Sequence, residues 1–153
     1  MRLPNATHES RPWRIREIAP DFTLEDVWAL PVYGGAGDFP ALLAVMASHD
    51  LTREAPPVTR LLFEVRWLLG RWFGWDDGDG RPIPGQDETT LAERLPDDLR
   101  GTAAGLRLGS RFAPLYRTDT EFAAEISNQT VHGVMHLAWV DRGEGRYQGQ
   151  MAV

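Results

Sequence analysis

Residues 130–140 read TVHGVMHLAWV, and the chain continues with DRGEG at 141–145 and RYQGQMAV at 146–153. Met135, Leu137 and Trp139 take alternate positions in the first segment, and Tyr147, Gly149 and Met151 do so in the second. Alternation of this kind is typical of a β-strand with one face on a core, so the final strand is expected to be half-buried. A five-residue loop with two glycines is typical of a β-hairpin. The segment therefore predicts an antiparallel hairpin that leads to the final strand.

The strand expected over 130–140 has two chemically different faces. Met135, Leu137 and Trp139 form the wall of a core or a cavity, whereas His132 and His136 lie on the other face. On a helix this spacing of histidines would suit zinc, but four residues of strand span ~13 Å, too far for one ion with Zn–N bonds near ~2.1 Å. The strand therefore argues against a metal site, and no metal or other cofactor is expected.

Upstream of the hairpin, helices are expected to interrupt the strands. Residues 13–16 alternate apolar and basic side chains between two prolines, which predicts a short edge strand. Thr23–Asp26 approximates a capping box, so a short helix is expected there, ending before Pro31. Asp38 is expected to cap a second helix with Pro40 in its first turn. The inward face of that helix is expected to consist of Leu42, Leu43, Val45 and Met46.

The strongest helical signal covers residues 58–73. Leu69 and Trp72 belong to its core face, while Phe63 and Trp67 form an aromatic pair on the far face. Burial on both sides explains this pattern, and so does a helix that binds a partner or a membrane surface.

The remaining segments complete an α+β pattern. Thr90–Glu93 forms a capping box that predicts a short helix limited by Pro96, and residues 112–116 favour a strand. Residues 120–126 are ambiguous, with alanine and glutamate favouring a helix. Helices inserted after a first strand and followed by an antiparallel sheet indicate one α+β domain over residues 1–153.

Composition excludes several classes of function. The chain has 153 residues with no cysteine, and all sixteen of its basic residues are arginine, which excludes thiolate chemistry and Schiff-base lysines. A net charge of −6 argues against nucleic acid as a partner. The start has no secretory signal, and the longest apolar run, Ala41–Ala47, is far too short to span a membrane. A cytoplasmic location is expected.

A histidine with a nearby carboxylate is a candidate for chemistry. Glu125 and Asn128 precede the strand that carries His132, and they could orient that ring as a general base. Tyr116 and Arg117 end the strand before. The sequence contains neither a glycine-rich phosphate loop nor a nucleophile elbow, which argues against nucleotide binding and serine hydrolysis.

Several segments together resemble the bacterial domain-of-unknown-function 2867 family. They are RPWRI at 11–15, PDF at 20–22, DVWALP at 26–31, LPDDLR at 95–100, FAAEI at 122–126, TVHGVMHL at 130–137 and GQMAV at 149–153. The family is similar to the START-like, SRPBCC helix-grip group, which implies a curved antiparallel sheet wrapped around a long C-terminal helix and an apolar cavity. Members of the family continue beyond the GQMAV strand, so the sequence is expected to lack the C-terminal grip helix and to be truncated there. The resemblance implies no catalytic residues.

Three functions follow as hypotheses. The first is binding of a small apolar molecule between the sheet and the 58–73 helix. The ligand-binding residues would be Tyr116, Met135, Leu137, Trp139, Leu69 and Trp72. The second is an enzyme of cyclase or isomerase type, in which His132 or His136 is the base beside Glu125. The third is an interaction module that uses Phe63 and Trp67.

Overall fold

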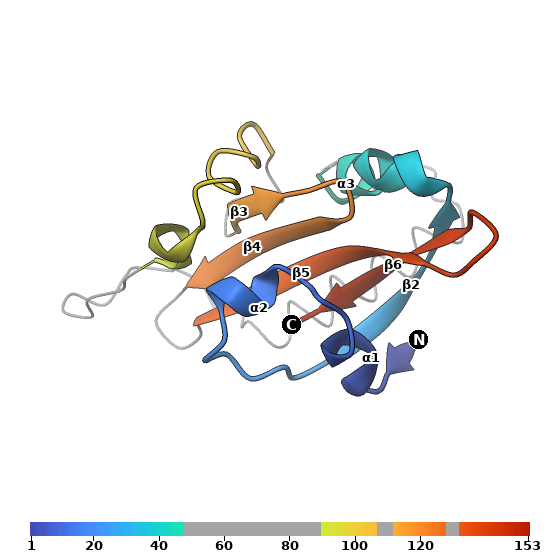
Figure 1. Cartoon of the computed structure of the whole chain (residues 1–153), viewed down its shortest axis with the longest axis horizontal. Coiled ribbons are helices and arrows are strands. Elements are labelled where there is room, and N and C mark those ends of the chain that lie inside the picture. Colours follow the sequence, from blue (N-terminus) through green and yellow to red (C-terminus); the bar gives the residue numbers. More distant parts are fainter. Residues whose placement is uncertain (48–89, 107–111, 128–131) are drawn as a thin grey trace, which may run out of the picture.

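The computed structural model describes residues 1–47, 90–106, 112–127 and 132–153 (Figure 1). In these residues one antiparallel sheet has the strand order β1-β2-β6-β5-β4-β3. The strands are β1 (Arg2–Leu3), β2 (Val27–Gly34), β3 (Ala113–Arg117), β4 (Glu121–Ser127), β5 (His132–Asp141) and β6 (Tyr147–Ala152). Short helices accompany the sheet, and the architecture is α+β, as the sequence predicts. The helix predicted over residues 58–73 lies outside the described residues.

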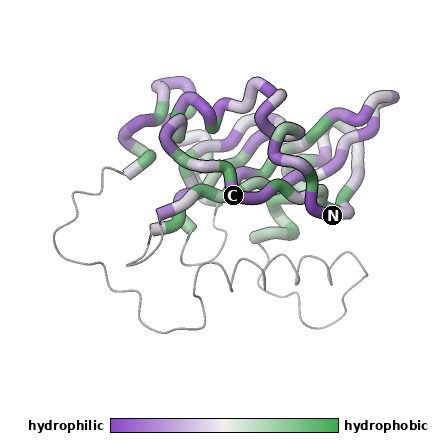
Figure 2. The backbone as a smooth tube through the Cα atoms, turned by 90° about the horizontal axis from the view of Figure 1, so that it is seen from below, coloured by the Kyte–Doolittle hydropathy of each residue, from purple (hydrophilic) through white to green (hydrophobic). Residues whose placement is uncertain are grey.

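The expected hairpin is present as β5 and β6. Leu137 pairs with Met151 in its register, and the connecting turn holds Gly143 and Gly145 at φ of 90° and 70°, where a side chain would be strained. This charged turn projects from the sheet and is hydrophilic, whereas apolar stretches run through the strands (Figure 2). One expectation is wrong: β6 is buried on both faces, because a layer of chain covers each side of the sheet.

Two apolar cores lie on opposite faces of the sheet. The first, here called the α3 core, contains Met135, Leu137 and Trp139 of β5 with Leu42 and Leu43 of α3 (Phe39–Ala47). The second, here called the cap core, contains Ala138 and Val140 of the same strand. It is covered by Trp13 and by α2 (Ile15–Ile18), and by residues 91–99. The alternation in residues 130–140 therefore divides the strand between two cores.

The helix predicted after Asp38 is confirmed as α3. The Asp38 carboxylate accepts a hydrogen bond from the Gly35 amide at 2.8 Å, across the short 3₁₀ turn η1 (Ala36–Asp38). Leu42 and Leu43 face the sheet as expected, but Val45 is 40% exposed and does not. Leu42 packs so closely on Gly149 of β6 that a Cβ at residue 149 would lie 3.2 Å from its Cδ2 atom.

The edge strand predicted at Trp13–Arg16 is wrong. The segment enters α2, where the Ala19 amide donates to the Ile15 carbonyl at 2.9 Å. Four alternating residues fit either structure, and the burial of Ile15, Ile18 and Ala19 on one helical face decides for the helix. The edge of the sheet is instead occupied by β1.

The helix predicted from Thr23 is also wrong, because residues 27–34 form the strand β2. Pro31 lies inside this strand, where it has no amide to donate to a neighbour. A register shift between Ala29 and Tyr33 in the pairing of β2 with β6 accommodates the proline. Pro31, which locally predicts the end of a helix, thus lies at an irregularity in a strand.

Two further elements differ from what the helix propensity or capping pattern of their residues suggests. The ambiguous segment at 120–126 is strand β4, since Phe122, Ala124 and Ile126 enter the α3 core while Ala123 enters the cap core. A short helix follows Thr90 as predicted, but it is the 3₁₀ helix η2 (Leu91–Arg94) and Thr90 makes no side-chain cap. The Leu91 amide instead donates to Glu125, at 3.1 Å from Oε1.

Candidate functional site

A cleft of about 810 Å³ lies between the sheet and the N-terminal segment of residues 4–26, here called the cap. The cap includes α1 (Ala6–Glu9) and α2. From the cap, Ile15, Phe22 and Leu24 contribute apolar surface, and Val134 and Ala152 contribute it from β5 and β6. Three histidines also line the cleft: His8, His132 and His136.

The first polar group of the cleft is the pair of His132 and Glu125. The Nε2 atom of His132 lies 2.6 Å from Oε1 of Glu125, and the histidine side chain is 38% exposed while the carboxylate is buried. The Leu91 amide also donates to this carboxylate. The ring of Phe22 meets that of His132 edge to face, with centroids 5.0 Å apart. Glu125 thus orients the His132 ring, as expected from the sequence. The contact uses Nε2 of the ring, so Nδ1 is the nitrogen that remains for another partner.

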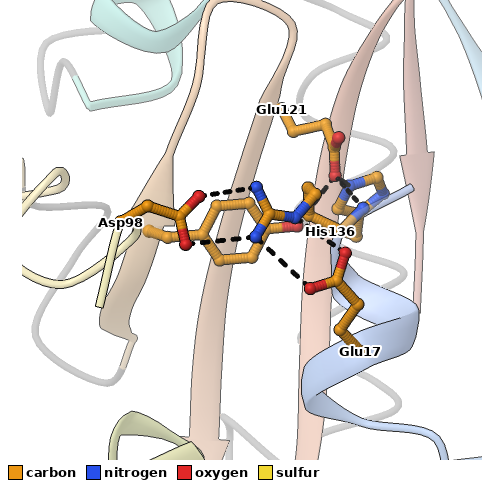
Figure 3. Close-up of polar contacts among 6 residues, drawn as sticks. Glu17, Asp98, Glu121 and His136 are labelled. Carbon is orange, nitrogen blue, oxygen red and sulfur yellow. Dashed lines mark hydrogen bonds and ion pairs between the residues drawn. The ribbon is translucent and has the colours of Figure 1, made fainter. Parts of the chain in front are cut away.

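The second polar group repeats this geometry one step along the strands. His136 Nε2 lies 3.1 Å from Oε2 of Glu121, and both side chains are buried. The two side chains point toward each other from neighbouring strands in Figure 3. In both pairs the histidine lies two residues before the register partner of its glutamate, a diagonal arrangement across an antiparallel ladder.

Glu121 is the most heavily hydrogen-bonded carboxylate of the site. Its Oε2 atom also accepts from the Tyr116 hydroxyl at 2.8 Å and from the Arg14 amide at 2.9 Å. Burial alone would raise the pKa of Glu121, but the hydrogen bonds from His136 and Tyr116, the charge of His136 and the Arg14 amide outweigh it and lower that pKa. Burial and the neighbouring Glu121 raise the pKa of Tyr116, so the phenol keeps its proton.

His8 extends this group toward the cleft. Its Nε2 atom lies 3.0 Å from Nδ1 of His136, although the two residues are 128 positions apart in the sequence. The Trp13 ring lies 5.5 Å from the ring of His136 and 6.0 Å from that of His8. Burial lowers the pKa of His8 to about 4, an effect increased by His136 and Arg16 and opposed by Glu121. His8 is therefore neutral at pH 7.

Arg14, whose backbone amide donates to Glu121, also forms ion pairs at the surface through its side chain. The Arg14 guanidinium contacts Asp98 at 2.8 Å and Glu17 at 2.8 Å. Figure 3 labels both carboxylates, each with dashed contacts. These contacts connect the cap to the segment after η2. They hold the residue whose amide donates to Glu121.

The predicted ligand-binding residues do not form one site in the structure. Met135, Leu137 and Trp139 are packed in the α3 core, whereas Tyr116 lies across the sheet in the cap core. Leu69 and Trp72 lie outside the described residues. Of the residues predicted for chemistry, His132, His136 and Glu125 share the cap-side face, but each histidine has its own glutamate.

Two functional candidates could not be recognised from the sequence. Glu121 carries a signal in retrospect, because it shares the period-two alternation of Ala123 and Glu125 once residues 121–127 are taken as a strand. His8 lies in a four-residue helix with no periodic pattern. Only the folded chain brings it to His136.

Most of the chain matches a known protein family. A family model described as a protein of unknown function, DUF2867, matches residues 18–153. The chain belongs to the DUF2867 family. The matched region contains both histidine–glutamate pairs, while His8 lies before it. No curated protein and no solved structure matches the chain.

Two further observations concern this DUF2867 chain. Within the described segments, no cluster of three or more histidine and carboxylate side chains is placed to hold a metal ion. No helix in the part of the chain that the structure describes is long and apolar enough to cross a bilayer.

Proposed function

We propose that this chain binds a small, mostly apolar molecule with a carbonyl or hydroxyl group in the cleft between cap and sheet. The observation that carries the proposal is a cleft of about 810 Å³ with a lining that is more apolar than polar and with histidines held by buried carboxylates. Arg16, Asp21 and Glu25 are among its charged residues. Small-molecule sites commonly have volumes of about 300–1,000 Å³, apolar linings and a few fixed polar groups. The resemblance to helix-grip proteins, whose sheets enclose apolar cavities, supports the same class of ligand.

The proposed site lies on the opposite face of the sheet from the one expected. Met135 and Leu137 are almost fully buried against α3, so a ligand there would have to displace packed side chains. The cap-side cleft requires no such rearrangement. A contribution of residues 58–73 to binding stays a prediction.

Fluorescence of Nile red, an uncharged apolar dye with a carbonyl group, tests this proposal. We expect saturable binding by the full chain and competition by 1-decanol. Val134→Phe fills the cleft floor and should weaken binding at least about tenfold. Val45→Phe makes the same change on α3, away from the cleft, and should leave binding unchanged. A titration that does not saturate, or equal binding by both variants, would overturn the proposal.

A second candidate function is acid–base catalysis of the isomerase or cyclase type. The 2.6 Å contact of His132 with Glu125 favours it, since a carboxylate that accepts the Nε2 proton leaves Nδ1 with a lone pair for a substrate proton. A ligand that fills the cleft beside His132 would exclude water from this base.

Ring opening of 5-nitrobenzisoxazole tests for such a base, because it begins when a base removes one carbon-bound proton. The full chain should accelerate the reaction over buffer, and His132→Gln should reduce that acceleration about a hundredfold or more. The exposed Glu144→Gln is the control. Equal rates for wild type and His132→Gln at an unchanged unfolding midpoint would exclude His132 as the base.

A further inference from the structure

The buried carboxylate of Glu121 decides where protons lie in the group behind the cleft. A charged carboxylate only accepts hydrogen bonds, so Nε2 of His136 carries a proton. Nδ1 of His136 lies 3.0 Å from Nε2 of His8. For these two nitrogens to form a hydrogen bond, one of them must carry a proton and the other a lone pair. Either His8 Nε2 donates to a neutral His136, or a charged His136 donates to His8.

These two arrangements differ in the state of the remaining nitrogen, Nδ1 of His8. When His136 is neutral, His8 has its proton on Nε2 and a lone pair on Nδ1. When His136 is charged, His8 is still neutral but carries its proton on Nδ1. A proton that enters at Nδ1 of His8 and a transfer from its Nε2 to His136 convert the first arrangement into the second.

The surroundings favour a positive charge on His136 over one on His8. An imidazolium at His136 would lie 3.1 Å from the Glu121 carboxylate, inside the cap core where charges interact strongly. His8 has no carboxylate in direct contact among the described residues, and Arg16 adds positive charge nearby. The Trp13 ring lies beside both histidines, and both histidine side chains are largely buried.

We propose that His8, His136 and Glu121 form a proton relay, in which Nδ1 of His8 exchanges a proton with the cleft and His136 stores it beside Glu121. In its unloaded form the relay removes a proton from a bound molecule. In its loaded form Nδ1–H of His8 gives a proton to a carbonyl oxygen while Nε2 takes the proton of His136. His132 on the same cleft can perform the opposite transfer, so the site suits a carbonyl compound that gains one proton and loses another.

The role toward a bound molecule rests on the proposed function, but the relay itself does not. It can be tested without ligand by ring ¹H–¹⁵N correlation NMR of the full chain between pH 8 and pH 5, with His8→Gln used to assign the His8 signals. We expect His8 to stay neutral and to change from the Nε2–H to the Nδ1–H tautomer as the pH falls. A merely structural hydrogen bond would leave the tautomer of His8 unchanged, and that result would overturn the relay. An imidazolium at His8 with neutral His136 would also overturn it.

Two further experiments, one with Glu121→Gln and one with Nile red, distinguish failure of the relay from failure of the proposed function. Glu121→Gln removes the negative charge 3.1 Å from His136, so the Nδ1–H tautomer of His8 should be less populated at each pH of the series. If that variant does not fold, the wild-type pH series still decides. Saturating Nile red should shift the ring signals of His8. Binding of the dye with no shift at His8 would overturn its role at the cleft, whereas a tautomer change without dye binding would overturn the proposed function alone.

Discussion

Glu121 and Glu125 are buried carboxylates beside the apolar cap core. A buried charge costs several kcal/mol unless hydrogen bonds replace its lost hydration. Glu121 receives donors from Tyr116, His136 and the Arg14 amide, and Glu125 receives them from His132 and the Leu91 amide. The donors come from the cap, from neighbouring strands and from η2. Each carboxylate therefore joins segments that are distant in the sequence.

The low pKa of His8 predicts that acid destabilises the fold. The pKa of His8 is about 4 in the folded chain and 6.5 for a fully solvated histidine, so between these values the unfolded chain binds a proton that the folded chain does not. Lowering the pH from 7 to 4 therefore lowers the free energy of unfolding, by about 3 kcal/mol from His8. Glu121, whose folded pKa is lowered, adds to the loss as the pH falls through and below its unfolded value.

Urea unfolding of the wild type and of His8→Gln at several pH values between 7 and 4 measures this contribution. The variant should have the shallower slope of unfolding free energy against pH. His132→Gln is the matched control, because it removes a histidine of the same cleft outside the His8–His136 contact. Parallel slopes for wild type and His8→Gln would contradict the assignment of the acid sensitivity to His8.

At the scale of single elements, the local sequence pattern predicted a helix or strand correctly where the spacing of its apolar residues matches the side chains that are buried. The β5–β6 hairpin and α3 were predicted from alternation, turn glycines and a cap. The strand at residues 27–34 was not predicted. A proline usually ends a helix, and the register shift that accommodates Pro31 exists only where β2 pairs with β6. His132 and Glu125 were linked from sequence because they are seven residues apart across one connection. His8 could not be, since tertiary structure alone brings it to His136.

Gly149 shows how closely α3 packs on the sheet. A Cβ at this position would lie 3.2 Å from Leu42 Cδ2 and 3.3 Å from Leu30 Cβ, and the larger side chain of valine would force the helix outward. Gly149→Val should therefore lower the free energy of unfolding by about 1–3 kcal/mol, measured by urea denaturation. Gly37→Val, where a Cβ meets nothing within 4 Å, should cost less than about 1 kcal/mol. Equal losses would show that α3 yields to the added side chain.

At the scale of the whole molecule, α3 and the cap cover opposite faces of one sheet. α3 follows β2 closely in the chain and packs on the sheet through apolar side chains. The cap packs on the other face through Trp13, Ile15 and Ile18 of the cap core. Polar bonds add to this packing, among them the Arg14 amide to Glu121 and the Glu25 amide to the Val153 carbonyl. Residues 20–25 of the cap line the cleft and none of them is buried, which favours local opening of this part of the cap before the sheet unfolds.

Ligand binding in the cleft should therefore suppress opening of the cap and leave α3 unaffected. A ligand at about one hundred times its dissociation constant stabilises the closed form by about 2.7 kcal/mol, which slows exchange through the open form about a hundredfold. We expect hydrogen exchange of the backbone amides in residues 8–25 to slow by this order when Nile red saturates the full chain. Residues 39–47 of α3 are the internal control and should exchange at an unchanged rate. Slowing confined to residues 39–47, or none in residues 8–25 at saturation, would show that the dye binds elsewhere than under the cap.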